Sequence, residues 1–164
     1  MSARLSRIAV LAGVALFFTL VALGNITDYG SNFAFVQHVL TMDTTFRSPA
    51  LMWRAIGSPA LHHAAYLAII AWQVLTAVLC WWGALRLWRV RRLEASIVEH
   101  AKRTGIAGLT AGFLLYAVGF IAIGGEWFAM WQSDTWNGQD TAAIFLTMVG
   151  IALLHLCGAE RDDP

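Results

Sequence analysis

The sequence predicts an all-α membrane protein, a bundle of four membrane-spanning helices that forms one integral membrane domain over residues 1–164. Hydrophobic residues make up 59% of the chain and charged residues only 13%, whereas soluble domains average about 45–50% and about 25%. Four apolar runs are also long enough to cross a bilayer, which takes roughly 20 residues. This composition excludes a soluble enzyme, a nucleic-acid-binding protein and a disordered chain as default interpretations.

The four predicted spans cover residues 8–25, 64–88, 106–125 and 141–158. Polar or charged residues flank each run, and none of the runs has a charged residue in its middle. Backbone groups in lipid must pair internally, so each run should be a helix. The first run, which follows Arg4 and Arg7, also has features of a secretory signal. Its length favours an uncleaved signal anchor.

The distribution of positive charge predicts the orientation of the helices. All but Arg47 and Arg54 of the eleven lysine and arginine residues lie at the N-terminus, between the second and third spans, or in the C-terminal tail. Positive loops stay in the cytoplasm. We therefore expect both termini to be cytoplasmic, in a bacterial inner membrane, with the two aromatic-rich loops on the outer side.

Two short helices are expected at the membrane interface in the first outer loop, over residues 31–40 and 49–56, because apolar residues and Ser-Pro pairs recur there at helical spacing. On the inner side, residues 87–104 are also helical in pattern. We expect the second spanning helix to continue past the bilayer and to turn back near Gly105. Four glycines in the third span, at positions 108, 112, 119 and 124, predict close helix packing.

Three tryptophans, Trp127, Trp131 and Trp136, lie within ten residues of the second outer loop. Tryptophan suits the headgroup region, where an aromatic belt anchors membrane proteins. The segments 126–139 and 35–46, together with Trp53-Arg54, resemble a bacterial family of uncharacterised, predicted small integral membrane proteins. The resemblance leads us to expect a proline after Thr44-Thr45-Phe46, and Arg47 departs from it at this position. The resemblance covers nearly the whole chain; it implies a four-span architecture and no enzyme activity.

Polar residues on the outer side predict structural contacts between the loops. Glu126 closes the third span and should be paired or hydrated. Arg54 is a candidate partner for either Glu126 or Asp43. Within the second span, Gln73 is expected to form a hydrogen bond across to another helix.

Metal and haem sites are weaker hypotheses. His38 and Met42 are four residues apart and would share a helix face, and His62 and His63 could approach them. Imidazole with thioether suits copper. His155 is the one histidine within a span, without an evident partner for haem ligation, so a structural hydrogen bond is the preferred interpretation.

The sequence favours a non-catalytic role, with no cofactor. We expect an accessory or structural subunit that packs against another membrane protein in a larger complex, for which a respiratory complex is one possible host, or against a second copy of this chain. The alternatives are a redox or metal-binding protein with copper or haem, and a small transporter. Transport is the weakest, because ionisable residues and broken helices are not evident at mid-membrane depth.

Overall fold

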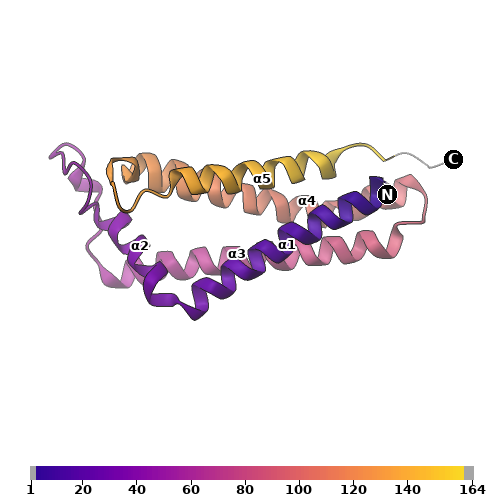
Figure 1. The fold of residues 1–164 in the computed structure, drawn as a ribbon, viewed down its shortest axis with the longest axis horizontal. Helices are drawn as coiled ribbons and strands as arrows, with labels where there is room; N and C mark the ends of the chain where they lie inside the picture. The colour runs from indigo at the N-terminus through magenta and orange to yellow at the C-terminus, as the bar shows by residue number, and fades with distance from the viewer. Residues whose placement is uncertain (1–2, 161–164) are drawn as a thin grey trace.

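The computed structural model describes residues 3–160, and every regular element in that range is helical (Figure 1). Four long helical segments lie lengthwise side by side. They are α1 (Ala3–Thr27), α3 (Pro59–Val90), α4 (Ala95–Leu114) with its π-helical continuation η2 (Leu115–Trp127), and α5 (Gln139–Cys157). All four are long and apolar enough to cross a membrane. The predicted all-α fold with four membrane-capable helices is therefore confirmed.

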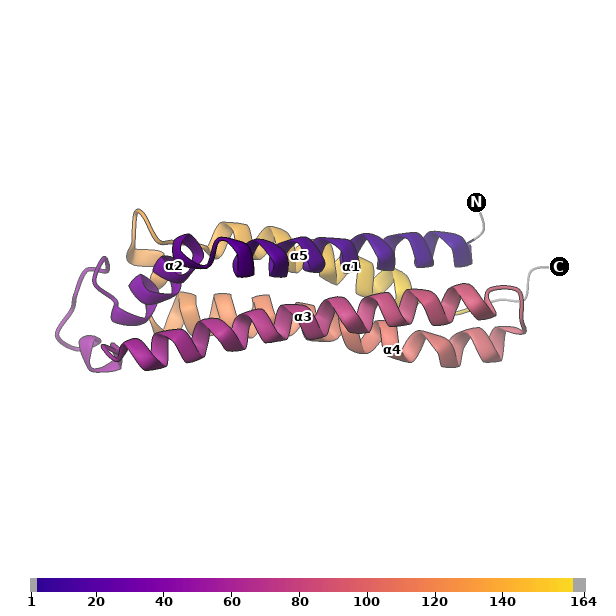
Figure 2. The same cartoon turned by 90° about the horizontal axis from the view of Figure 1, so that it is seen from below.

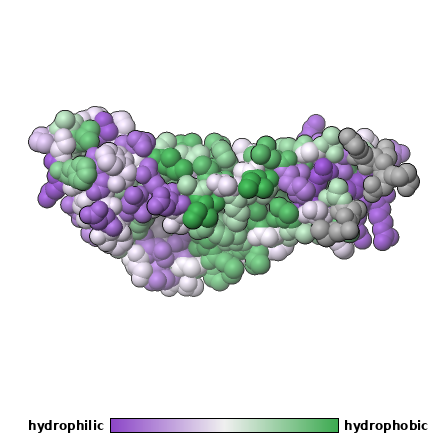
Figure 3. Space-filling model, turned by 45° about the horizontal axis from the view of Figure 1, so that its top comes forward, coloured by the Kyte–Doolittle hydropathy of each residue, from purple (hydrophilic) through white to green (hydrophobic). Residues whose placement is uncertain are grey.

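The two ends of the bundle differ in structure (Figure 2). One end holds both ends of the described chain and the α3–α4 turn, and we call it the basic end (residues 3–7, 86–104 and 155–160). The other holds α2 (Tyr29–Thr41) and two short 3₁₀ turns, η1 (Met52–Arg54) and η3 (Met130–Gln132), and we call it the cap end (residues 28–58 and 126–140). A hydrophobic band lies between them (Figure 3). Its position suits a bilayer that crosses the middle of the bundle.

The turn between α3 and α4 corrects one expectation. The chain does not turn near Gly105; α3 ends at Val90, residues 91–94 make the turn, and α4 begins at Ala95. Arg4 stabilises this turn, because its guanidinium Nη1 donates to the carbonyl oxygens of residues 91 and 93, at 3.2 and 2.8 Å. Gly105 has a different role, as a close-packing position within α4.

Glycines let α3 and α4 approach closely in the basic half. A Cβ atom added to Gly83 would lie 2.6 Å from the Cα of Gly105. Gly108 and Gly112 are similarly crowded, by Cys80 and Phe18 respectively. The close-packing interpretation therefore holds for these two of the four predicted glycines. It fails at positions 119 and 124, where a Cβ would meet nothing closer than 3.5 Å, because the helices separate there.

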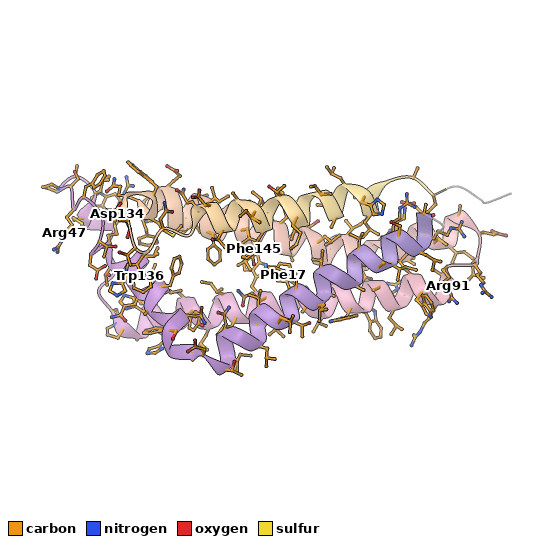
Figure 4. All side chains as sticks on the ribbon, in the orientation of Figure 1. Phe17, Arg47, Arg91, Asp134, Trp136 and Phe145 are labelled. Carbon is orange, nitrogen blue, oxygen red and sulfur yellow. The ribbon has the colours of Figure 1, made fainter. Side chains whose placement is uncertain are left out.

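The helices diverge toward the cap end, where α1 leaves α5 (Figure 1). Phe17 of α1 and Phe145 of α5 form the last aromatic bridge between them, with ring centroids 4.8 Å apart (Figure 4). Beyond this bridge, α2 and the loops cover the open end. Along η2 the helix has the wider π-helical form. This form is rare in proteins and, where it occurs, often lies at a functional site.

The first predicted short helix is present as α2, one or two residues longer at each end than expected. The second is reduced to the 3₁₀ turn η1. The chain is extended at Ala55, and the backbone N–H of Ile56 then donates to the carbonyl oxygen of Leu40 at 2.8 Å, so the loop returns to α2 where the second helix was expected to continue. Their placement in the membrane interface stays a prediction, as does the orientation of the bundle.

Candidate functional site

Two loops meet at the cap end and hold each other in place. The hydroxyls of Thr44 and Ser133 share a hydrogen bond of 2.8 Å, and the side-chain carbonyl of Gln132 accepts from the backbone N–H of Phe46 at 3.0 Å. Below these contacts lies a small apolar core, which includes the buried residues Met42 and Met130. The first and second cap loops therefore form one unit rather than two independent loops.

Arg54 joins the cap loops through aromatic rings. Its guanidinium carbon lies 4.7 Å from the ring centre of Trp127 and 5.5 Å from that of Trp53, and Nη1 donates to the carbonyl oxygen of Trp127 at 3.3 Å. Neither predicted carboxylate partner reaches it within residues 3–160: Glu126 is exposed without an ion pair, and Asp43 pairs with His38. Arg54 is still the link between the loops that the sequence suggested, through a different partner.

The four candidate metal ligands lie in different surroundings. Met42 is 1% exposed in the apolar core of the cap, whereas His38 lies outside it, where Nδ1 is 2.8 Å from Asp43. The left-handed backbone of Met42, with φ 53°, ends α2 and breaks the shared helix face that the sequence suggested.

The other two histidines also point apart. His62 is buried, and its Nε2 donates to the carbonyl oxygen of Ile56 at 2.7 Å. His63 lies on the outside of α3, stacked on the ring of Phe33 at 4.1 Å, with Nδ1 2.8 Å from the hydroxyl of Tyr29. Among the described residues, no three His, Cys, Asp or Glu side chains form a metal-binding group.

The three predicted interface tryptophans separate into two groups. Trp127 and Trp131 are exposed, at 45% and 49%. Trp136 is partly buried, stacked on the ring of His38 with centroids 4.6 Å apart, and faces into the bundle (Figure 4). Only the first two are therefore available on the surface of the cap.

A cavity of about 410 Å³ lies inside the cap half of the bundle, in the region where α1 and α5 diverge. Its wall includes Asn25, Gln73, Tyr116 and Trp136. Gln73 forms the cross-helix hydrogen bond that the sequence suggested: its side-chain carbonyl accepts from the amide of Asn25 at 2.7 Å. Sequence reasoning missed the cavity itself, although the polar residues within the apolar spans were its signal.

The comparison with protein families agrees with this architecture. A family model described as a predicted small integral membrane protein, DUF2165, matches residues 3–158. The chain belongs to the DUF2165 family. Neither a curated protein nor a solved structure matches it. The protein is thus a multi-pass integral membrane protein that associates with the lipid bilayer.

At the basic end of this DUF2165 protein, a buried lysine is held by the residues that follow α5. Lys102 is 0% exposed, and its three N–H donors contact Glu99, Glu160 and the carbonyl oxygen of Gly158 at 3.0, 2.9 and 2.6 Å. An ammonium group has three donors, so Lys102 is fully satisfied. The sequence showed a charged inner loop but not this pairing.

The Glu160 carboxylate also binds the other end of the chain. Arg4 lies 3.2 Å from one of its oxygens, and Arg7 forms an ion pair with the other. Burial alone would raise the pKa of this carboxyl, but the hydrogen bond and charge of Lys102, with those of Arg7, outweigh it and lower the pKa. Nearby, His155 of α5 contacts the hydroxyl of Ser6 on α1 at 3.1 Å, a structural hydrogen bond between helices.

Proposed function

We propose that this protein is a non-catalytic accessory subunit, which associates through its cap end with another membrane protein in a larger complex. The observation that carries the proposal is a set of exposed rings that are fixed in place. Phe46 and Trp53 are 72% and 69% exposed, and they form T-shaped pairs with Trp131 and Trp127 respectively, with ring centroids 5.9 and 5.5 Å apart.

Fixed aromatic rings suit the centre of a protein interface. Tryptophan and arginine are enriched among the residues that contribute most binding energy, and rings already held in pairs lose little freedom on binding. Arg47 and Asp134 also lie among the cap loops (Figure 4). This charged setting favours a protein partner over the apolar edge of the bilayer.

The proposal includes an orientation and a membrane. We place the basic end in the cytoplasm and the cap end outside, on the positive-inside rule. The resemblance to a bacterial family supports the bacterial cytoplasmic membrane as the location.

The test is native gel electrophoresis of the protein extracted from its own membrane in mild detergent. The wild-type protein should migrate with a larger complex. Trp131→Ala should weaken that association by about 2 kcal/mol, roughly 30-fold in the dissociation constant. Trp82→Ala is the matched control, because Trp82 is 54% exposed on α3, away from the cap; it should leave the association unchanged.

Three results would overturn the accessory role. If the protein is extracted as a pure monomer, it has no stable partner. If it is extracted only as an oligomer of identical chains, it associates with itself rather than with another protein. Haem or copper at about one equivalent per chain would give precedence to a redox function.

A further inference from the structure

We propose that the cavity in the cap half of the bundle binds an uncharged, lipid-soluble ring that carries carbonyl oxygens, as quinones do. This ligand site is independent of the accessory role proposed above. The cavity is partly open, and it is lined by residues of α1, α2, α3, η2 and α5 and of the loop before α5. Its volume of about 410 Å³ lies within the range of roughly 300–1,000 Å³ that is usual for small-molecule sites.

The cavity wall offers no charged side chain to balance a charged ligand. None of the residues that line it is Asp, Glu, Lys, Arg or His. An ion within the hydrophobic band of a membrane protein needs an opposite charge or metal beside it, because its desolvation is otherwise too costly. The wall does hold uncharged hydrogen-bonding groups, so the chemistry favours a neutral molecule with polar atoms.

Two of these groups belong to buried residues on different helices that line the cavity. Tyr116 of η2 is 3% exposed, and its hydroxyl makes no hydrogen bond with any of residues 3–160. Gln73 of α3 is 2% exposed; its carbonyl already accepts from Asn25, which leaves its N–H groups without a protein acceptor. Both side chains line the cavity and have donor capacity left, which a ligand with acceptor oxygens would use.

The position of Gln73 is fixed by a hydrogen-bond relay. The hydroxyl of Tyr66 donates to the backbone carbonyl of Asn25 at 3.0 Å, and the amide of Asn25 donates to Gln73 at 2.7 Å. The relay orients the Gln73 amide before any ligand arrives. Such preorganisation lowers the entropic cost of binding.

Aromatic rings line the rest of the wall. Phe35 of α2 lies between Phe120 and Trp136, with centroid distances of 6.4 and 6.3 Å, and Phe145 belongs to the same wall. Aromatic side chains prefer offset or edge-on contact with another ring. A flat ring fits this surface better than the flexible chains of a phospholipid.

A second, apolar groove adjoins the cavity and can take a hydrocarbon tail. It has a volume of about 200 Å³ and shares Val36, Ile69 and Phe120 with the cavity wall. Gly119 and Gly124 of η2 lie along it, without a side chain to fill the space. The carbonyl-bearing ring therefore occupies the polar cavity, and the tail lies in the groove between α3 and η2.

The experiment measures binding of decylubiquinone to the full chain in detergent, by native mass spectrometry and by the shift in melting temperature. One molecule per chain should bind saturably. Val21→Phe should weaken binding more than tenfold, because Val21 lines the cavity on α1. Leu20→Phe, at the neighbouring position, is the matched control; Leu20 is 57% exposed and away from the cavity, so binding should be unchanged.

A second pair of variants tests the hydrogen bond without changing the packing. Tyr116→Phe removes only the free hydroxyl, and should weaken binding about three- to tenfold, as expected for one hydrogen bond. Tyr29→Phe, whose hydroxyl contacts His63 outside the cavity, should have no effect.

The outcomes that overturn the proposal are distinct. Equal binding by the Val21→Phe and Leu20→Phe variants shows that the quinone is elsewhere. If Val21→Phe weakens decylubiquinone binding but Tyr116→Phe does not, Tyr116 makes no hydrogen bond to a ligand carbonyl. The proposed ligand class is then wrong. Displacement of decylubiquinone by an equal concentration of phosphatidylcholine identifies the cavity as a phospholipid site.

Discussion

Arg54 is the residue that connects the two loops of the cap end. It contacts Trp53 next to it and Trp127 of the other loop. The sequence marked it correctly as a link, because only two basic residues lie among the cap loops. The sequence could not identify the partner, because carboxylates and aromatic rings both attract a guanidinium and only the fold decides which one is near.

The first prediction compares the two cap arginines. Arg54→Ala removes a charge-assisted hydrogen bond and two cation–π contacts, and should lower the free energy of unfolding by about 2 kcal/mol. Arg47 is exposed, so Arg47→Ala should change it by less than about 0.5 kcal/mol. Denaturant titration in detergent micelles measures both. Equal, small losses would show that Arg54 contributes no more than a surface residue.

The second prediction concerns pH and Glu160. Its carboxyl has a lowered pKa in the folded protein. The stability that this carboxylate contributes is therefore complete above the unfolded-state pKa of about 4.3 and is lost as the pH falls through the folded-state pKa. Melting temperatures measured from neutral to acidic pH should show this loss.

Glu160→Gln gives the matched comparison. At neutral pH it should lower the free energy of unfolding by about 3 kcal/mol, because Lys102 stays charged and buried after it has lost one of its two carboxylate partners. Its stability should then depend less on acidic pH. Glu126→Gln, at an exposed position without an ion pair, should keep the wild-type pH profile. An unchanged profile for Glu160→Gln would contradict the assignment.

At the scale of elements, the contact between α3 and α4 rests on backbone approaching backbone. A Cβ at Gly83 would meet backbone before any side chain, since the nearest atoms are the N and Cα of Gly105 at 2.6 Å, ahead of the Leu11 side chain at 3.3 Å. The two helices would have to move apart. This contact also explains why Gly105 is not a turn: a residue without a side chain serves close packing as readily as it serves a turn.

The third prediction follows from this contact. Gly83→Ala should separate α3 from α4 and lower the melting temperature clearly. Gly13→Ala is the control on α1, where an added Cβ meets nothing within 4 Å; it should be neutral or stabilise by about 0.5–1 kcal/mol through helix propensity. If both variants melt alike, the tight contact between α3 and α4 is not a determinant of stability.

The helices were predictable because each rests on a local property, a long apolar run. Their ends were less so. The α3–α4 turn depends on Arg4, which lies in a distant part of the chain, and the short η1 depends on the return of Ile56 to Leu40. Contacts between distant segments leave no periodic pattern in the sequence, so the boundaries that they set could not be predicted.

The same reasoning applies to the candidate sites at the scale of the whole molecule. The cross-helix role of Gln73 could be predicted, because a mid-membrane amide must find a partner. The cavity beside it could not, since it arises from the angle between α1 and α5. The buried pairing of Lys102 with Glu160 was equally hidden, because it depends on where the chain goes after α5.

The fourth prediction concerns the whole bundle. The basic end should face the cytoplasm, so a reporter fused after Pro164 should be active only if it is a cytoplasmic type. Both ends of the described chain lie at this end (Figure 2). A second reporter, fused before residue 3, should therefore report the same side of the membrane as the one after Pro164. A periplasmic reporter active after Pro164 would reverse the assignment.

The ionic cluster around Glu160 has a consequence for biosynthesis. The ribosome makes Arg4 and Arg7 first, Lys102 midway, and Glu160 only after all four membrane-capable helices. Until then, a lysine destined for a fully enclosed position has no carboxylate from beyond α5. A nascent chain that stops short of Glu160 therefore leaves buried Lys102 with one of its two carboxylate partners, Glu99, and lacks the carboxylate that joins the N-terminal arginines to α4.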